Sequence, residues 1–246
     1  MSESFLERAA KWYRSETHQK AAWRGLEATL DPNTLEIFKR AYRGSQVPQE
    51  KAEANHPHTP YSVTANWART LDVPYYYQRD SKTGQGERMC FSSSMTMALD
   101  FLQPDLIEGD DDWYLQIVQR FGDSVDSHAQ VQAARYLGFE CEFRTDGTKR
   151  DIEVLLETGY PVPIGVLHKG HYIYPEGGGH WITLIGHEDD HFIVHDPFGR
   201  MDLVNGGYPH AGPTDGKERK YGKDLLMSRW LIANDHDGWF MDLSNN

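Results

Sequence analysis

The spacing of apolar residues predicts a run of helices in the middle of the chain. Between residues 90 and 102, apolar side chains recur at intervals of three and four, which is typical of a helix with one buried face. The expected inner face comprises Phe91, Met95, Ala98, Leu99 and Leu102. Two further helices are expected around 113–120 and 129–137. A fourth begins at Thr148, with Asp151 three residues later as a capping-box variant, and ends at Gly159.

Apolar runs with turn residues between them predict strands in the following segment. We expect strands in PVPIGVL (161–167), HWITLIGH (180–187) and HFIVHDP (191–197), the last two joined as a hairpin by Glu188, Asp189 and Asp190. LDVPYYYQRD (71–80) is predicted to form a short aromatic strand that leads into a glycine-rich loop. Helices followed by a mainly antiparallel sheet indicate an α+β fold.

The first part of the chain has a different pattern. Residues 1–44 are predicted to form a pair of helices, because their apolar residues follow helical spacing and Asp31-Pro32 is typical of a helix start. Residues 45–66 are predicted to be a linker, because this stretch is rich in proline and lacks apolar periodicity. The remaining domain is expected to span 67–246, and we expect the helical pair to dock a partner.

Composition narrows the classes of partner. The 246 residues include 25 Lys and Arg against 37 Asp and Glu, a net charge of −12, with no basic cluster. We therefore expect no nucleic-acid partner. No apolar run is long enough to span a membrane, and the N-terminus lacks the features of a signal peptide. We expect a cytoplasmic protein, or one delivered by other machinery such as a phage particle.

Cys90 stands at the front of the predicted helix 90–102, where a nucleophile would be activated. A thiol attacks amides as thiolate, and both a helix N-terminus and a partner imidazole favour that form. Cys141, between Glu140 and Glu142, is predicted to be a core thiol. A disulfide between the two cysteines would disable the nucleophile, so two free thiols are the preferred interpretation.

His180 is the candidate partner for the thiol. It begins a strand directly after three glycines, and the predicted hairpin brings it close to Asp196 at the open end. An imidazole oriented by a carboxylate is the pair that a cysteine nucleophile requires. His171 is the rival for the base, since its loop could also border the cleft. Gln78 and the backbone N–H of Cys90 are the expected donors to an oxyanion.

These segments together resemble the double-glycine leader (bacteriocin-processing) peptidase-like family of papain-like cysteine peptidases. The resemblance covers roughly residues 71–200 and rests on VPYYYQRD, the Cys-led helix and GGHWITLIG…FIVHDPFG. It implies a papain-like fold and the catalytic set Gln78, Cys90, His180 and Asp196. Many members have glycine directly after the cysteine, whereas this chain has Phe91, which alters the subsite behind the thiol.

The expected activity is hydrolysis of a peptide or amide bond through a Cys90 thioester, without a cofactor. Five residues are candidates for binding the peptide substrate: Tyr75, Tyr77, Phe91, Gly179 and Trp181. By analogy the predicted target is a bacterial cell-wall peptide, in a phage or bacterial lysin-type role. The alternatives are a non-catalytic peptide-binding module on the same fold and an acyl or amide transferase.

No metal site is expected. Five histidines follow one another from the loop before His180 to the end of the hairpin: His168, His171, His187, His191 and His195. They lack the spacing of a zinc motif and are interpreted as exposed strand or loop residues. The run Glu108–Asp112 lacks the spacing of a calcium loop and is predicted to be a solvated turn that caps the next helix.

Overall fold

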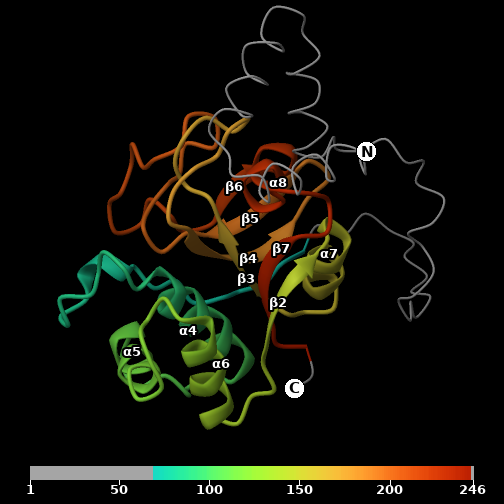
Figure 1. Ribbon diagram of the computed structural model, residues 1–246. Helices are drawn as coiled ribbons and strands as arrows, with labels where there is room; N and C mark the ends of the chain where they lie inside the picture. The colour runs from blue at the N-terminus through green and yellow to red at the C-terminus, as the bar shows by residue number, and fades with distance from the viewer. Residues whose placement is uncertain (1–68, 245–246) are drawn as a thin grey trace, which may run out of the picture. The chain divides into compact units, whose positions relative to one another are not determined.

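The computed structural model describes residues 69–244 (Figure 1). The predicted helical pair at 1–44 and linker at 45–66 lie outside the described residues, so both remain predictions. The chain divides into two compact units, and the second of them spans Asn66–Asn246. All that follows concerns this second unit.

The four helices predicted in the middle of the chain are confirmed. They are α4 (Cys90–Leu102), α5 (Asp111–Val118), α6 (Ser127–Tyr136) and α7 (Lys149–Glu157). Thr148 and Asp151 form the complete capping box at the start of α7. A further helix, α8 (Lys223–Trp230), was not predicted, because its apolar residues do not keep to one face.

The strands of the described residues form one antiparallel sheet. They are β1 (Arg69–Thr70), β2 (Glu142–Gly147), β3 (Val162–Val166), β4 (His180–His187), β5 (His191–His195), β6 (Arg219–Gly222) and β7 (Gly238–Asp242). Their order is β2-β7-β3-β4-β5-β6, and β1 pairs with β4. The predicted hairpin of β4 and β5 is confirmed, with a bulge between Leu184 and Gly186. With the helices, this sheet confirms the α+β class.

The prediction of a strand over residues 71–80 is wrong. The segment after β1 runs beside the sheet with few ladder bonds: the N–H of Leu71 donates to Ile185, and the N–H of Gln78 donates to Pro197. Pro74 has no N–H to donate, which breaks a strand ladder. The segment ends in a 3-10 turn, Gln78–Asp80.

Two hydrophobic clusters hold the second unit together. One joins the central strands to α7 and α8, and the other joins α4, α5 and α6 to Trp181 and the end of β7. Figure 1 shows α4, α5 and α6 grouped together, apart from α7 and α8. Thr183 in β4 donates a hydrogen bond to the carbonyl of Ser94 in α4 at 3.0 Å. This contact fixes α4 against β4 and therefore sets Cys90 beside His180.

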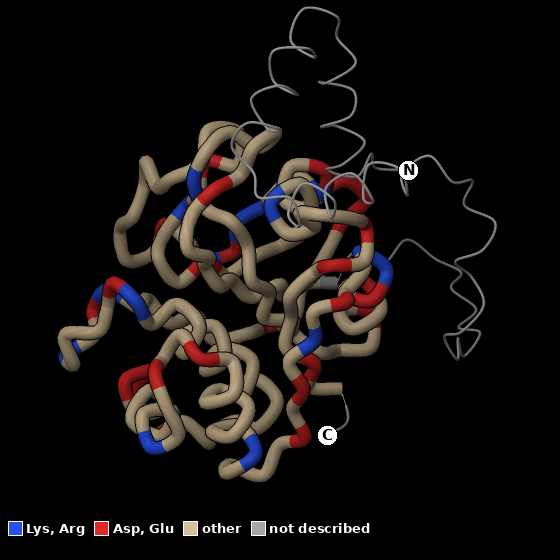
Figure 2. Tube along the Cα trace, in the orientation of Figure 1, with Lys and Arg blue, Asp and Glu red and all other residues tan. Residues whose placement is uncertain are grey.

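The charged residues do not segregate by sign. Figure 2 shows Lys and Arg interspersed with Asp and Glu along the described trace. None of the helices in residues 69–244 combines the length and the apolar character needed to cross a bilayer.

Candidate active site

Cys90 is the first residue of α4 and is partly exposed. No side chain among residues 69–244 caps this helix, so within this part of the chain the first backbone N–H groups, including that of Cys90, have no side-chain acceptor. The serine hydroxyls of the first turn bind other groups instead. The hydroxyl of Ser93 donates to Met89 and Asp111, and the hydroxyl of Ser92 accepts from Gln130. The start of α4 therefore presents the positive end of the helix dipole at Cys90.

His180 and Asp196 form a buried pair at the open end of the β4–β5 hairpin. Nε2 of His180 lies 2.8 Å from Oδ1 of Asp196, and the two side chains are 5% and 0% exposed. The imidazole uses Nε2 for Asp196, so Nδ1 is the nitrogen left for the thiol. The structure thus brings these two predicted residues together.

The thiolate of Cys90 and the imidazolium of His180 stabilise each other. Burial by itself would raise the pKa of Cys90, but the charge of His180, its hydrogen bond and a backbone hydrogen bond with Trp181 outweigh burial and lower that pKa. Burial would lower the pKa of His180, but the charges of Asp196 and Cys90 raise it to about 10. Both shifts favour a thiolate–imidazolium pair at neutral pH.

Asp196 is held by more groups than His180 alone. Its Oδ1 also accepts the N–H of Phe198 at 3.1 Å, and its Oδ2 accepts the hydroxyls of Tyr208 and Tyr221, each at 3.2 Å. Gly216 lies against the backbone of Asp196 so closely that a Cβ there would meet the Asp196 carbonyl oxygen at 1.8 Å. Sequence reasoning missed both tyrosines, because they lie in an irregular segment and a later strand without a pattern that pairs them with Asp196.

Gln78 lies at the start of the 3-10 turn and is 1% exposed. Its Nε2 donates to the carbonyl of Gly86 at 2.6 Å, and its own N–H donates to Pro197 at 3.0 Å. Gly86 permits this approach, since a Cβ there would lie 2.8 Å from the carbonyl oxygen of Gln78. The amide nitrogen has a second hydrogen that neither of these bonds uses, and Oε1 of Gln78 has no hydrogen-bond partner among the described residues.

The candidate substrate-binding residues have different environments. The structure corrects the prediction for Phe91, because only 1% of this residue is exposed and its ring stacks on Trp181 with centroids 3.5 Å apart. The ring of Trp181 is likewise buried, at 9% exposure, so Trp181 reaches the thiol through its backbone.

The other three candidates remain predictions. Gly179 is exposed beside His180 with φ of 89°, a conformation that favours glycine. The hydroxyl of Tyr75 donates to the Asp196 carbonyl at 3.0 Å, and that of Tyr77 donates to the Ala211 carbonyl. Both tyrosine rings are half-buried, so part of each faces outward.

The remaining histidines separate by environment. His171 is exposed on the loop before β4, where its Nδ1 accepts from the N–H of Ile173 at 3.4 Å. The prediction that His195 is exposed is wrong: it is 0% exposed, with Nε2 against the Val73 carbonyl and Nδ1 accepting from Glu218. The geometry therefore favours His180 over His171 as the partner of Cys90.

His168 lies beside His180 in a half-buried environment. Its ring centroid is 5.7 Å from that of His180, and its Nδ1 has no hydrogen-bond partner among the described residues. Burial and the charge of His180 lower the pKa of His168 to about 4. A neutral imidazole at this position leaves the positive charge of the site on His180.

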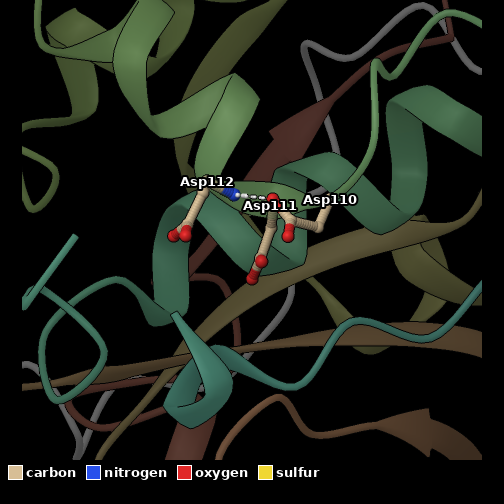
Figure 3. A group of neighbouring side chains, drawn as sticks. All are labelled: Asp110, Asp111 and Asp112. Carbon is tan, nitrogen blue, oxygen red and sulfur yellow. Dashed lines mark hydrogen bonds between the residues drawn. The ribbon is translucent and has the colours of Figure 1, made fainter. Parts of the chain in front are cut away.

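Asp110, Asp111 and Asp112 lie together at the start of α5 (Figure 3). Each carboxylate already has a protein donor: Asp110 accepts from the N–H of Asp112, Asp111 from Ser93, and Asp112 from Ser81 and the N–H of Lys82. Asp110 thus caps α5, as predicted, but the expectation of a solvated turn is wrong, because Asp111 and Asp112 are only 1% and 7% exposed. The hydrogen bonds of these two residues tie the glycine-rich loop and α4 to the start of that helix.

A known protein family and several solved structures are similar to this chain. The Peptidase_C39 like family matches residues 70–205, which is more than half of the chain. No curated protein matches the sequence. One similar solved structure is the peptidase domain of Streptococcus ComA, a bi-functional ABC transporter involved in quorum sensing. The two sequences are 15% identical, the match covers 63% of this chain and 90% of that chain, and the TM-score is 0.42.

Two further structures are similar at the same level. A protein described as a C39-like peptidase from Bacillus anthracis has 14% identity, covers 71% of this chain and 96% of its own, and gives a TM-score of 0.48. The other is a double glycine motif protease from an AMS/PCAT transporter, in complex with the leader peptide. It has 15% identity, the match covers 70% of this chain and 91% of that chain, and the TM-score is 0.42. The order of the Cys-led helix and the strands that carry His180 and Asp196 is the papain-like arrangement expected from the sequence, and the chain belongs to the Peptidase_C39 like family.

Proposed function

We propose that this protein is a cysteine peptidase that hydrolyses a peptide bond through a thioester on Cys90. The observation that carries the proposal is the linked set of Cys90, His180 and Asp196. The thiol stands at a helix N-terminus against an imidazole that is itself bound to a buried carboxylate at 2.8 Å. Family membership supports peptidase chemistry of this general type.

In the first half of the reaction, the thiolate of Cys90 attacks the carbonyl carbon of the scissile bond. The oxygen of the tetrahedral intermediate is stabilised by the free N–H of Cys90 and the second N–H of the Gln78 amide. As the C–N bond breaks, the imidazolium of His180 gives its proton to the leaving amine. The products of this half are a free amine and a thioester on Cys90.

In the second half, water resolves the thioester. His180, now neutral, accepts a proton from water as the oxygen attacks the thioester carbonyl. The C–S bond breaks, the acid product leaves and the thiolate–imidazolium pair is restored. Asp196 keeps its bond to Nε2 throughout, so Nδ1 stays directed at the sulfur and the substrate. No cofactor takes part in this scheme.

The proposed substrate is the bacterial cell-wall peptide predicted from the resemblance, in a lysin-type role. An amine in place of water would make the same site an acyl transferase, and a site that binds without turnover would make it a binding module. Incubation of the full chain with purified cell walls, followed by mass analysis of released muropeptides, separates these outcomes. New amino and carboxyl termini that are absent with Cys90→Ala are the expected result.

The same experiment identifies each alternative. New cross-links or amine adducts that depend on Cys90 would indicate transfer rather than hydrolysis. Retention of the protein on the walls without new termini, equally with Cys90→Ala, would contradict the peptidase and favour the binding module. Cleavage of peptides other than wall peptides would keep the peptidase and reject this substrate.

A further inference from the structure

An exposed arginine directly follows the predicted oxyanion donor. Arg79 comes after Gln78 in the 3-10 turn, and 37% of its side chain is exposed. Its guanidinium lies over the ring of Phe198, with Cζ 5.0 Å from the ring centroid. Phe198 in turn packs edge-on against the imidazole of His180, with centroids 6.3 Å apart and planes at 86°. One aromatic ring therefore separates this cation from the base of the candidate active site.

The guanidinium of Arg79 is held in place by three groups. Its Nε donates to Glu87 at 3.0 Å, its Nη1 donates to the carbonyl of Ala211 at 3.4 Å, and a hydrogen bond links its side chain to Tyr77. A guanidinium has five N–H groups. The bonds within residues 69–244 use three of them, so two N–H groups stay open to an acceptor from outside this part of the chain.

The ion pair with Glu87 leaves Arg79 able to bind a second carboxylate. The side chain of Glu87 is 73% exposed, and exposed ion pairs are weak because water screens them. A planar guanidinium can bind a carboxylate through two parallel N–H bonds, a geometry that an ammonium group does not offer. Arg79 is therefore a partly exposed cation, already oriented, with donors that suit a carboxylate.

The position of Arg79 beside His180 indicates which part of a substrate it would meet. In the proposed reaction His180 gives its proton to the leaving amine, so a group packed against this imidazole borders the amine product. The separations of 6.3 Å and 5.0 Å through Phe198 together set the longest distance from the His180 ring centre to the guanidinium carbon. An extended peptide advances about 3.3 Å per residue, and the hydrogen bonds at its two ends each span about 3 Å. The reach therefore corresponds to the first or second residue after the scissile bond.

We propose that Arg79 binds a free carboxylate on the first or second residue after the scissile bond, so that the protein prefers peptides that end shortly after this bond. This inference rests on the proposed peptidase function and adds an exopeptidase-type specificity to it. The C-terminal carboxylate is the favoured source, because every free chain end carries this charge whatever its side chains are. Bond cleavage follows the proposed reaction, with water as the second reactant.

The test uses the full chain and a degenerate hexapeptide library, synthesised once as the free acid and once as the C-terminal amide. Mass spectrometry of the products identifies the cleaved bond. We expect the acids to lose one or two C-terminal residues with a kcat/KM about tenfold above that of the amides, the usual contribution of a hydrogen bond to a charged group. The difference should lie in KM, because this ion pair forms before the chemical step and persists through it.

Substitutions separate a binding role of Arg79 from a structural one. Arg79→Lys keeps the charge without the planar fork and should retain part of the preference for acids. Arg79→Glu should reverse the preference, whereas a purely structural loss would slow both libraries equally and leave their ratio unchanged. Arg120→Glu is the matched control, since the guanidinium of Arg120 also lies over an exposed ring, that of Tyr136, with Cζ 5.6 Å from the centroid. It should leave the ratio as in the wild type.

The possible outcomes distinguish this inference from the peptidase proposal. Equal cleavage of acids and amides, unchanged in Arg79→Glu, would overturn the carboxylate site and keep the peptidase. Arg79-dependent cleavage beside Asp or Glu in both libraries would assign the carboxylate to a side chain and overturn the exopeptidase specificity.

If neither library is cleaved, fluorescence anisotropy of the labelled libraries with Cys90→Ala decides. Tighter binding of the acids than of the amides, abolished when Arg79→Glu is added, would overturn the peptidase and support the carboxylate site. Equal binding of the two libraries would overturn both.

Discussion

Asp196 is a buried carboxylate that has no lysine or arginine partner among the described residues, and its four hydrogen-bond donors explain how it remains in place. Two of them, Tyr208 and Tyr221, bind the oxygen that does not contact His180. Burial, followed by the charge of Asp196, raises the pKa of both phenols well above their ordinary value, so both remain donors. The tyrosines therefore orient Asp196, and Asp196 orients His180.

Tyr208→Phe should lower kcat about tenfold without unfolding the protein. The change removes one hydrogen bond to a charged group, worth about 1.5 kcal/mol, and leaves the ring that packs edge-on against His180. Since Asp196 raises the pKa of His180, a less well-oriented Asp196 should also move the alkaline limit of activity to lower pH. Tyr136→Phe, an exposed control, should change neither quantity. A wild-type pH profile in Tyr208→Phe would contradict the positioning role.

The site residues that could be predicted from sequence are those that regular elements place. His180 and Asp196 follow from the alternation and the turn of one hairpin, and Cys90 follows from the start of one helix. Tyr208 and the close approach of Gly216 could not be predicted, because residues 197–218 carry no period from which their path follows. Gln78 remains a predicted oxyanion donor, and the strand assigned to its segment was wrong.

At the scale of elements, α4 is fixed through a buried carboxylate at the start of α5. Asp111 is 1% exposed and accepts the hydroxyl of Ser93 in the first turn of α4. Burial, partly offset by Ser93 and reinforced by the neighbouring aspartates, raises the pKa of Asp111 to about 6. This pKa exceeds that of an aspartate in the unfolded chain, so between about pH 4 and 6 the folded protein binds more protons than the unfolded protein. The free energy of unfolding therefore falls as pH rises through that window.

Asp111→Asn should therefore stabilise the protein at pH 7.5 by about 2 kcal/mol, and the gain should disappear near pH 4. Asparagine keeps an oxygen that can accept from Ser93 but does not ionise. Urea unfolding at the two pH values measures the difference. Asp189→Asn, on an exposed turn, is the control. An Asn variant that is less stable than the wild type at pH 7.5 would show that the ionised carboxylate is needed there.

Arg229 of α8 ties together two irregular segments that flank the site. It is 0% exposed, and its guanidinium donates to five backbone carbonyls at 2.8 to 3.5 Å. The acceptors are Leu167, Lys169, Gly170, Leu203 and Val204. These segments carry His168 and lead into Tyr208, so α8 organises the loops on the Asp196 side of the site.

Arg229→Met should lower the free energy of unfolding by at least about 3 kcal/mol, because several buried carbonyls lose their donor at once. Urea denaturation measures the loss. Arg150→Met provides a matched control, since Arg150 is 51% exposed and pairs with Glu157 at the surface. That change should cost less than about 1 kcal/mol. Equal effects of the two substitutions would contradict the organising role of Arg229.

Element prediction succeeded where one apolar face decides the structure and failed where tertiary contacts decide it. The central helices and the β4–β5 hairpin have strong local patterns. β6, α8 and β7 do not: β6 contains Arg219 and Lys220, and β7 exposes Trp239. They are held by pairing with β5 and β3 and by packing around Trp230.

At the scale of the whole molecule, the division between residues 1–66 and the peptidase-like domain remains a prediction. Limited proteolysis should cut first within 45–62 and leave a fragment that begins near residue 62, because linkers are cleaved before packed segments. The fragment should keep its thermal unfolding transition and its activity on small peptides. A fragment that unfolds would show that the N-terminal residues belong to the same folded unit.

The central claim is that His180, and not His171, activates Cys90. The rate of alkylation by iodoacetamide at pH 6, followed by peptide mass mapping, tests this claim without knowledge of the substrate. Burial raises the pKa of Cys141 to about 12, so this second cysteine serves as an internal control. In the wild type, Cys90 should react far faster than Cys141. The lowered pKa of Cys90 allows the thiolate to form below the ordinary pKa of a thiol, and the raised pKa of His180 keeps the imidazole protonated beside it.

His180→Ala should slow the labelling of Cys90 at pH 6 by at least about tenfold, because the thiolate loses its imidazolium partner. His171→Ala, which changes an exposed loop residue, should leave the rate within about twofold. Circular dichroism should show that both variants remain folded. Slow labelling in His171→Ala with fast labelling in His180→Ala, or equal rates for Cys90 and Cys141 in the wild type, would contradict the account.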